Sequence, residues 1–429
     1  MRVILLTPEY PPFIWGGVGT HVQQLAVALA QRGHEVHTFS FAPYQLPTAS
    51  ERGVTNHYLA PNKSSSEYTV PSLDDVEELN AQCLQLIRQL FASTHHLPHI
   101  IHLHGWYGIL AARDLKSEFG WPVVMTAHGI HRGQHRERRN ELMATEVDPL
   151  EEREHLAIKT VDRIIAVSHL LRQKLLEEYE LPDDFVNTIW NGLDPASLED
   201  STGEEIDRSI LELCFERLKT RRLLLFVGRV VRAKGVLPLL RVFQEVLRRA
   251  GDVQLILAGE MLDPSYGELV TEFVNADPLL SEHVLFTGKL SQSTLAILYQ
   301  HAYLVVIPSS YEALPYVALE AMAYSKPVIA SDAGGLVEVV KQDETGLLVP
   351  LTKNEDDGSP EVDSAALSSA LMRVLDDASL ASRFGANGRE RFLARFTVEQ
   401  MTVSTERLYT DVLAQCLKLP ARHEALPIA

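Results

Sequence analysis

Short apolar runs, each as long as a buried strand, alternate with amphipathic helical segments along most of the chain. In the first half these runs predict strands at residues 3–6, 35–39, 99–104, 122–126, 163–167 and 186–190. A helix is predicted after the first run, from about residue 20 to residue 31, because apolar residues recur there at helical spacing. Strands that alternate with helices favour a parallel sheet covered by helices on both faces. We therefore predict an α/β fold built from doubly wound, Rossmann-like sheets.

The alternation stops and restarts near the middle of the chain. The segment Asn191-Gly192-Leu193-Asp194-Pro195 ends the first series, and the acidic run at 198–207 is typical of a linker. Strands of a second series are predicted at 223–227, 253–257, 284–286, 303–307, 327–330 and 347–349. A polar surface loop is predicted at 353–363 and an amphipathic helix at 396–419. Because 429 residues are too many for one ordinary core, we predict two domains, 1–195 and 196–395, followed by a C-terminal helical segment, 396–429.

The charge balance and the cysteines narrow the class of protein. A formal net charge of −18 argues against nucleic acid as a partner, because phosphate backbones need clustered cations. The three cysteines are far apart and form no C-x-x-C pair, which is typical of a reduced compartment without disulfides. The first apolar run is broken by Pro8 and is too short for a signal peptide or a membrane span. We expect a soluble, cytoplasmic protein with small-molecule partners, whereas its oligomeric state cannot be predicted.

Two glutamates eight residues apart, Glu312 and Glu320, mark the most informative stretch. Glu312 follows the predicted strand at 303–307, and Glu320 falls in a helical segment that starts near Pro315. In open α/β sheets ligands bind at the carboxyl edge, where amides at a helix start favour an anion. A carboxylate pair there can bond sugar or ribose hydroxyls. The alternative is that Glu312 caps the helix and Glu320 is an ordinary surface residue.

Two other segments that follow strands could bind phosphate. Gly16-Gly17-Val18-Gly19 offers backbone amides, although it could also be a structural turn. It is no dinucleotide fingerprint, because Val22 stands where a third glycine is required. Residues 228–235 are not a Walker loop, but Arg229 and Lys234 can converge on a diphosphate. The alternative for this second segment is a solvated basic turn.

Histidines and aromatic residues gather where strands of the first domain are predicted to end. His128 follows the strand at 122–126, and a single histidine at such a place is more often structural than catalytic. His102 and His104 share one strand face, but no third ligand at a metal-site spacing is apparent, so we expect no metal site. Trp106 or Tyr107 is better suited to be an aromatic platform for a sugar.

A basic stretch, HRGQHRERR, follows at residues 131–139. Arg132 and Arg136 in this stretch could bind the phosphate of an acceptor sugar, since arginine forks match phosphate oxygens. The alternative is the solvated, charged start of a helix.

Taken together, these strings resemble the motifs of the retaining nucleotide-sugar glycosyltransferases of family 4. The resemblance is carried by the E-x7-E pair with its trailing E-A-M-A-x-x-x-P-V-I-A-x-x-x-G-G, by G-R-x-x-x-x-K-G, and by T-x-H at His128. The string PEYPP…GGVGTHV resembles the glycogen- and maltose-phosphate-synthase branch. One departure is Ser325, where the family commonly has Gly; we interpret this position as a helix C-terminus. The resemblance covers nearly the whole chain and implies the GT-B arrangement, two Rossmann-like domains facing across a cleft, with the last helix crossing back to the first domain.

The resemblance also implies a role for each motif in a front-face displacement that retains configuration. Arg229 and Lys234 would hold the diphosphate, Glu312 would orient the donor sugar, Glu320 would bind the ribose, and His128 would stabilise the sugar at the transition state. Further donor contacts are expected from the glycine loop and from the residues between the two glutamates: Gly16, Gly17, Leu314, Pro315 and Tyr316. Since no D-x-D motif ends a strand, no metal is expected to be obligatory, and Mg²⁺ would at most stimulate.

The expected donor is UDP- or ADP-glucose, and the base is not encoded in any motif. The expected acceptor is a sugar phosphate, as in sucrose-phosphate or maltose-phosphate synthesis. The first alternative is a glycogen-synthase-like enzyme that extends an α-glucan. Two further alternatives are a non-catalytic regulator that binds nucleotide sugars, against which the complete set of motif residues argues, and a nucleotide-sugar epimerase.

Overall fold

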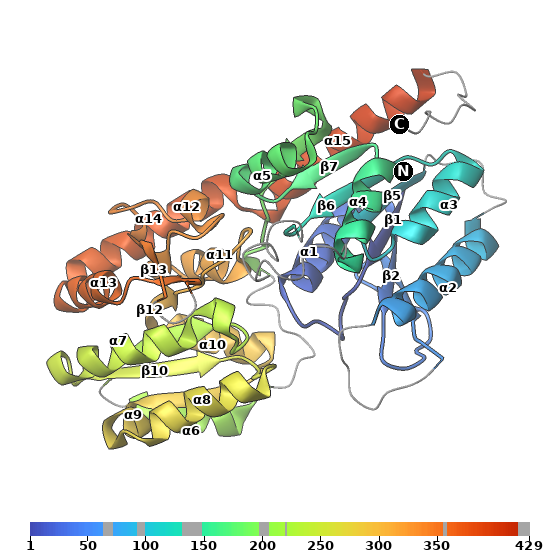
Figure 1. The fold of residues 1–429 in the computed structure, drawn as a ribbon. Coiled ribbons are helices and arrows are strands. Elements are labelled where there is room, and N and C mark those ends of the chain that lie inside the picture. The colour runs from blue at the N-terminus through green and yellow to red at the C-terminus, as the bar shows by residue number, and fades with distance from the viewer. Residues whose placement is uncertain are drawn as a thin grey trace. The chain divides into compact units, whose positions relative to one another are not determined.

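The computed structural model describes residues 1–62, 72–91, 99–130, 148–196, 206–218, 221–354 and 358–418. The chain divides into two compact units (Figure 1). The first unit contains Met1–Gly192 and the chain from Val398 onward, and the second contains Leu193–Thr397. The chain therefore leaves the first unit once and returns to it with its last helix.

The first unit is built on an eight-stranded sheet in the order β3-β4-β2-β1-β5-β6-β7-β8. The strands are β1 (Arg2–Thr7), β2 (Glu35–Phe41), β3 (Ala49–Glu51), β4 (Val54–Leu59), β5 (His99–His104), β6 (Val123–Ala127), β7 (Arg163–Ala166) and β8 (Val186–Thr188). All neighbours are parallel except β3 and β4, which form a hairpin. From β1 the chain first winds outward through β2 and then returns to place β5 on the other side of β1. The gap between β1 and β5 is thus the switch point, where open sheets of this kind bind ligands.

The helices of the first unit include the last helix of the chain. They are α1 (Gly17–Gln31), α2 (Leu73–Phe91), α3 (Ile109–Phe119), α4 (Pro149–Thr160), α5 (His169–Tyr179) and α15 (Val398–Lys418), with a short 3-10 helix at Asp183–Phe185. Helix α15 packs on α1, and its Tyr409 and Val412 belong to the same buried cluster as Leu25 and Leu29 of α1. About 1.5–3 kcal/mol is typical for fully burying one large apolar side chain, so this face anchors α15.

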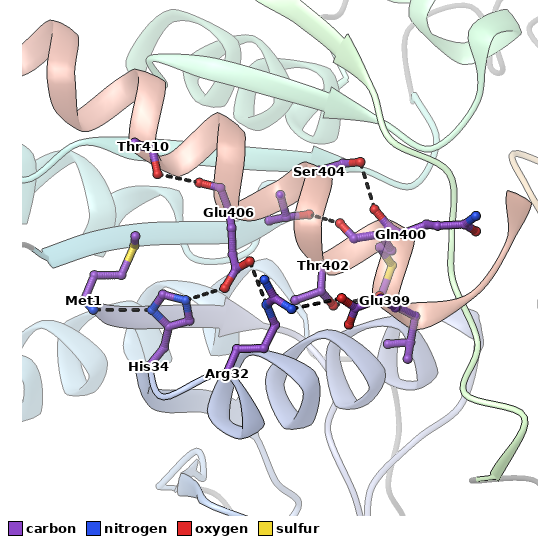
Figure 2. Close-up of polar contacts among 12 residues, drawn as sticks. Met1, Arg32, His34, Glu399, Gln400, Thr402, Ser404, Glu406 and Thr410 are labelled. Carbon is purple, nitrogen blue, oxygen red and sulfur yellow. Dashed lines mark hydrogen bonds and ion pairs between the residues drawn. The ribbon is translucent and has the colours of Figure 1, made fainter.

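Ion pairs at the rim of the α1–α15 contact fix how the two helices are aligned. Figure 2 shows Arg32 between two glutamates of α15, with Nη1 2.9 Å from Glu399 Oε1 and Nε 2.7 Å from Glu406 Oε2. His34 Nε2 lies 2.6 Å from the other oxygen of Glu406. Exposed ion pairs typically contribute about 0–1 kcal/mol each, so they specify alignment more than they stabilise the unit.

The second unit is built on a six-stranded parallel sheet in the order β11-β10-β9-β12-β13-β14. Its strands are β9 (Arg222–Val227), β10 (Val253–Ala258), β11 (Val284–Gly288), β12 (Ala302–Ile307), β13 (Val328–Ser331) and β14 (Gly346–Val349). Its helices are α6 (Arg208–Leu218), α7 (Val236–Arg249), α8 (Pro264–Asn275), α9 (Pro278–His283), α10 (Gln292–His301), α11 (Tyr316–Ala323), α12 (Leu336–Val339), α13 (Ser364–Asp376) and α14 (Ala378–Arg395), with a 3-10 helix at Arg232–Lys234. The switch point lies between β9 and β12. The predicted fold class, α/β with doubly wound sheets, is confirmed.

The structure differs from the sequence-based expectations at three places. Helix α1 begins at Gly17 rather than near residue 20, because the glycine loop itself coils into the first helical turn. Strands β3 and β4 were not predicted, since their polar residues hide the strand pattern. Within the predicted loop at 353–363, β16 (Pro360–Val362) pairs antiparallel with β15 (Leu351–Lys353). Among the described residues no helix is both long enough and apolar enough to cross a membrane.

We predict that Ser325→Gly stabilises the second unit. Ser325 follows the C-terminus of α11 with φ of +57°, as expected for the position where the family commonly has Gly. A residue with a Cβ is disfavoured in this left-handed conformation by roughly 1–2 kcal/mol, partly offset by the flexibility of glycine in the unfolded chain. The free energy of unfolding should therefore rise by about 0.5–1 kcal/mol. Urea unfolding of Ser325→Ala, which keeps the Cβ, is the control; an equal gain in both variants would contradict this explanation.

Candidate active site

Two predicted site residues meet at the switch point of the second sheet. Lys234 follows β9 and Glu312 follows β12, and Lys234 Nζ lies 2.5 Å from Glu312 Oε1. Ser309 Oγ donates a second hydrogen bond to the same oxygen, at 2.8 Å. The side chains of Lys234 and Glu312 are 22% and 11% exposed, so the pair is sheltered but open to a ligand. The two residues that the resemblance assigns to the diphosphate and to the sugar are thus neighbours.

Glycines let the loops around this pair approach each other backbone to backbone. A Cβ on Gly235, whose φ is +67°, would lie 2.1 Å from Pro308 O. On the other side, a Cβ on Gly334 would lie 1.9 Å from Glu312 O. Gly335 N donates to that same oxygen at 2.9 Å. The glycines that end the K-G and G-G motifs therefore clamp the loop that carries Glu312.

Arg229 stands apart from this pair. It is exposed, and among the described residues no carboxylate forms an ion pair with it. The backbone on both sides is fixed, since Val230 N donates to Glu260 O at 2.8 Å and Gly228 N donates to Ala258 O at 2.9 Å. A guanidinium held on a fixed loop and open to solvent can take part in binding an anion.

Glu320 is buried rather than on the surface. It is 6% exposed, and Tyr299 Oη donates a hydrogen bond to its Oε2 at 2.7 Å. Burial raises the pKa of the Glu320 carboxyl, and the bond from Tyr299 offsets part of the rise. The residues just before it on the chain, Leu314 and Tyr316, are buried as well. The alternative that Glu320 is a surface glutamate is therefore wrong.

The other alternative, that Glu312 caps the helix, is also wrong. The N-cap residue of α11 is Pro315, whose side chain forms no capping hydrogen bond. Glu312 instead pairs with Lys234, three loop residues before that cap. Both glutamates thus occupy positions that helix capping and surface exposure do not explain.

In the first unit, a buried carboxylate that the sequence analysis missed organises the glycine loop. Glu9 is 2% exposed, and its Oε2 accepts hydrogen bonds from Trp15 N and Gly16 N, both at 2.8 Å. The amide of Gly16 is therefore already used, so the predicted phosphate contact falls to the first turn of α1, which begins at the exposed Gly17. The signal for Glu9 was its place directly after β1, inside the PEYPP string.

A cluster of histidines lies beside the switch point of the first sheet. His104 ends β5, His128 follows β6, and His21 comes from α1. His104 Nδ1 is 3.3 Å from His128 Nε2, and the His21 and His128 rings meet edge to face at a centroid distance of 4.7 Å. The sequence showed no third histidine at a metal-site spacing, and the fold supplies one from a different element. His102, in contrast, is occupied by Tyr409 Oη at 2.5 Å and Thr126 Oγ1 at 2.7 Å.

Burial keeps these imidazoles neutral. It lowers the pKa of His21 to about 4 and that of His102 to about 3. Burial, followed by the nearby histidines, also holds the pKa values of His104 and His128 well below their usual range. His128 is the one that remains partly exposed. It can thus offer a ligand a neutral hydrogen-bonding group rather than a positive charge.

The remaining predicted site residues contribute unequally. Trp106 is 5% exposed and stacks on Tyr107 at a centroid distance of 4.3 Å, so Tyr107 is the more accessible of the two rings. Arg132 and Arg136 lie outside the described residues.

We predict that Glu320→Gln stabilises the protein at neutral pH without ligand. Because the folded-state pKa of Glu320 is raised above 4.5, its contribution to stability is present below that pH and is lost as the pH rises through the folded-state pKa. The amide still accepts the hydrogen bond from Tyr299 but carries no charge. At pH 7.5 the variant should be more stable by about 1 kcal/mol, and this advantage should shrink toward pH 4.5.

Thermal unfolding at several pH values measures this difference. Glu272→Gln, on an exposed site of α8, is the control and should change little at any pH. If Glu320→Gln were less stable than the wild type at pH 7.5, the burial argument would be wrong.

Comparisons with known proteins identify the family of this chain. The family described as Glycosyltransferase Family 4 matches residues 15–197, and the family described as Glycosyl transferases group 1 matches residues 215–391. The chain is 30% identical over 422 residues to alpha-maltose-1-phosphate synthase of Mycolicibacterium smegmatis, and the alignment covers 96% of this chain and 100% of that protein. It is 27% identical over 421 residues to a glycogen synthase of Mycobacterium tuberculosis, covering 95% and 94% of the two chains.

A solved structure is similar over nearly the whole length. Sucrose-phosphate synthase from Thermosynechococcus elongatus matches with a TM-score of 0.75 and 25% identity, and the match covers 97% of this chain and 100% of that one. The two family models together cover the glycine loop, His128, Arg229, Lys234 and both glutamates. The chain belongs to glycosyltransferase family 4 and is a glycosyltransferase with the GT-B fold.

Proposed function

We propose that this protein is a retaining hexosyltransferase that moves glucose from UDP- or ADP-glucose to a sugar phosphate. The observation that carries the donor half is the Lys234–Glu312 pair at the switch point of the second sheet, with the exposed Arg229 on the same connection after β9 as Lys234. A sheltered cation beside a carboxylate suits a nucleotide sugar, which has a diphosphate next to a ring of hydroxyls. The chain as a whole is acidic, so this local positive charge has to be supplied by particular residues.

In the proposed reaction Lys234 turns from Glu312 to the donor diphosphate, and Arg229 binds the same group. Charge that develops on the leaving diphosphate is then stabilised by two cations already in place, commonly the largest catalytic effect. Glu312, once released, accepts hydrogen bonds from hydroxyls of the glucose, and Glu320 accepts from the ribose. The leaving diphosphate takes the proton of the acceptor hydroxyl on the same face, so the configuration at the anomeric carbon is retained.

The first unit is proposed to contribute His128 and the start of α1. A neutral His128 can hydrogen-bond the glucose without repelling the positive charge that develops on its ring at the transition state. The first-turn amides at Gly17 would face the donor phosphate. Because Arg229 and Lys234 supply the positive charge, Mg²⁺ is proposed to be stimulatory at most.

The proposal for the acceptor rests on the basic stretch with Arg132 and Arg136 and on the relatives. Two proteins similar to this chain are named for products that are sugar phosphates. A third is named glycogen synthase, which keeps α-glucan elongation as the second candidate. A non-catalytic regulator or an epimerase would release no nucleotide diphosphate in response to an acceptor.

The decisive assay measures nucleotide-diphosphate release from UDP-, ADP- and GDP-glucose, each crossed with four acceptors. These are fructose 6-phosphate, glucose 1-phosphate, glucose 6-phosphate and glycogen. We expect release with UDP- or ADP-glucose only when a sugar phosphate is present, and loss of this turnover in Arg132→Ala or Arg136→Ala. Turnover with glycogen alone would refute the sugar-phosphate acceptor but keep the donor proposal. The anomeric configuration of the product, read by NMR, tests retention.

Lys234→Ala tests the diphosphate role. Removing one charged group that stabilises a transition state typically lowers kcat by roughly 10²–10³-fold, and we expect a loss of this size here. Lys326→Ala is the matched control, because Lys326 precedes β13 at the amino edge of the same sheet and its Nζ donates to Gln300 O at 2.8 Å. A similar loss in both variants, or no loss in Lys234→Ala, would rule out this role for Lys234.

A further inference from the structure

Three histidines from three different elements of the first unit point nitrogen atoms at one another. They are His21 of α1, His104 at the end of β5 and His128 after β6. One ring nitrogen from each lies within 4.8 Å of the other two. No stretch of sequence contains more than one of them, so the fold alone creates the cluster.

The hydrogen bond between His21 and Asn191 determines which of the two ring nitrogens of His21 carries a lone pair. Nδ1 lies 2.9 Å from Asn191 Oδ1, and because an amide oxygen only accepts, Nδ1 carries the hydrogen. Nε2 therefore carries the lone pair. It is buried, with His21 2% exposed, and it has no hydrogen-bond partner among the described residues. A polar atom buried in this way typically costs about 1–3 kcal/mol unless a ligand satisfies it.

His104 also has a buried ring nitrogen without a hydrogen-bond partner among the described residues. It is 1% exposed, and its Nε2 is likewise buried without a partner in the described part of the chain. Its Nδ1 meets His128 Nε2 at 3.3 Å. The neighbouring His102 shows the contrast, because hydrogen bonds to Tyr409 and Thr126 use both of its nitrogens. Among the buried histidines of the first unit that the structure describes, ring nitrogens without a hydrogen-bond partner are thus found in His21 and His104, both of which belong to the cluster.

We infer that His21, His104 and His128 together bind one divalent transition-metal ion, and that Zn²⁺ suits the set best. Imidazole nitrogens favour Zn²⁺, Cu²⁺ and Ni²⁺, whereas Mg²⁺ and Ca²⁺ require oxygen ligands, which this cluster lacks. Three histidines that leave a fourth position open are a known zinc arrangement. Asn191 acts as the outer partner that orients His21, as metal-bound histidines commonly require.

The dimensions of the cluster and the lone pair of His21 agree with this assignment. Nitrogens that bind a tetrahedral Zn²⁺ at about 2.1 Å lie roughly 3.4 Å from one another. The three nitrogens here lie within 4.8 Å of one another, so side-chain movements of about an ångström would bring them to the distances that an ion requires. Metal ions bind the neutral form of imidazole, through the ring nitrogen that carries the lone pair, as Nε2 of His21 does here. This inference concerns metal binding only and does not depend on the proposed transferase reaction. An ion bound here would use a nitrogen of His128, the residue proposed to hydrogen-bond the glucose.

The test is a metal titration of the full-length protein, purified without a histidine tag and stripped with a chelator. Co²⁺ is the probe, because a site with imidazole ligands in a tetrahedral arrangement gives intense visible absorption. We expect one Co²⁺ per chain, displaced by one Zn²⁺, and a higher Tm in the presence of Zn²⁺. Weak binding of several ions without this absorption would overturn the inference.

Variants locate the site. His21→Gln and His104→Gln should each weaken Zn²⁺ binding by at least 100-fold, and Asn191→Ala, which removes no ligand, by about 10–100-fold. His57→Gln is the control, since His57 is a buried histidine of the same unit that pairs with His37 instead, and its Zn²⁺ affinity should equal that of the wild type. Binding that survives both ligand variants would overturn the inference.

X-ray absorption at the zinc edge of the wild-type protein answers the question if a ligand variant fails to fold. Three imidazole nitrogens in the first shell would support the site. A shell made of carboxylate oxygens, or one with a single imidazole, would overturn it.

Discussion

Backbone-to-backbone contact at the carboxyl edge of the second sheet is the constraint on which the proposed donor site depends. The loops after β9, β10, β12 and β13 approach so closely that only glycine fits between them. Gly235 lies against Pro308 O, Gly259 against Gly228 O, and Gly334 against Glu312 O, each at a distance that a Cβ would reduce to about 2 Å. A methyl group at Gly235 or Gly334 would push the Glu312 loop away, and one at Gly259 would displace the backbone next to Arg229. The glycines therefore act indirectly, by holding charged groups in place before a ligand arrives.

The two units prepare their candidate sites by opposite electrostatic means. In the second unit the groups are charged and partly open, and Lys234 and Glu312 neutralise each other. In the first unit burial removes charge from the imidazoles, while Glu9 is buried and accepts hydrogen bonds from two backbone amides of the glycine loop at one oxygen, Oε2. Glu320 is the exception in the second unit, since it is buried with Tyr299 as its partner. A carboxylate kept there despite its effect on stability is typical of a residue selected for function.

Much of this arrangement could be predicted because it depends on residues close together in sequence. Strand β5 was predicted with its observed bounds, since Ile100, Ile101 and Leu103 are a local signal that needs no tertiary information. Lys234 and Glu312 were each predicted to follow a strand of the second series, and parallel strands end at one edge of a sheet. Their direct contact was not predicted. The edge strand β3 and its neighbour β4 were missed because polar residues interrupt the apolar pattern of their sequences.

What could not be predicted depends on contacts between distant segments. The burial of Glu320 is set by Tyr299 and by the packing of α11, and a glutamate in a helix gives no sign of either. Glu9 became important only once the glycine loop was seen to fold back on it. The cluster of His21, His104 and His128 joins a helix to the ends of two strands, so no spacing along the chain could reveal it.

Helix α15 also sets the order in which the protein can be completed on the ribosome. The second unit is one continuous segment, Leu193–Thr397, so every residue of its core has been synthesised before α15 appears. The first unit lacks Tyr409 and Val412 from its core until the last helix emerges, although its eight strands were made first. The side of α1 that packs on α15 thus lacks that helix during synthesis of the whole second unit. The half of the protein that is translated first is therefore the half that finishes folding last.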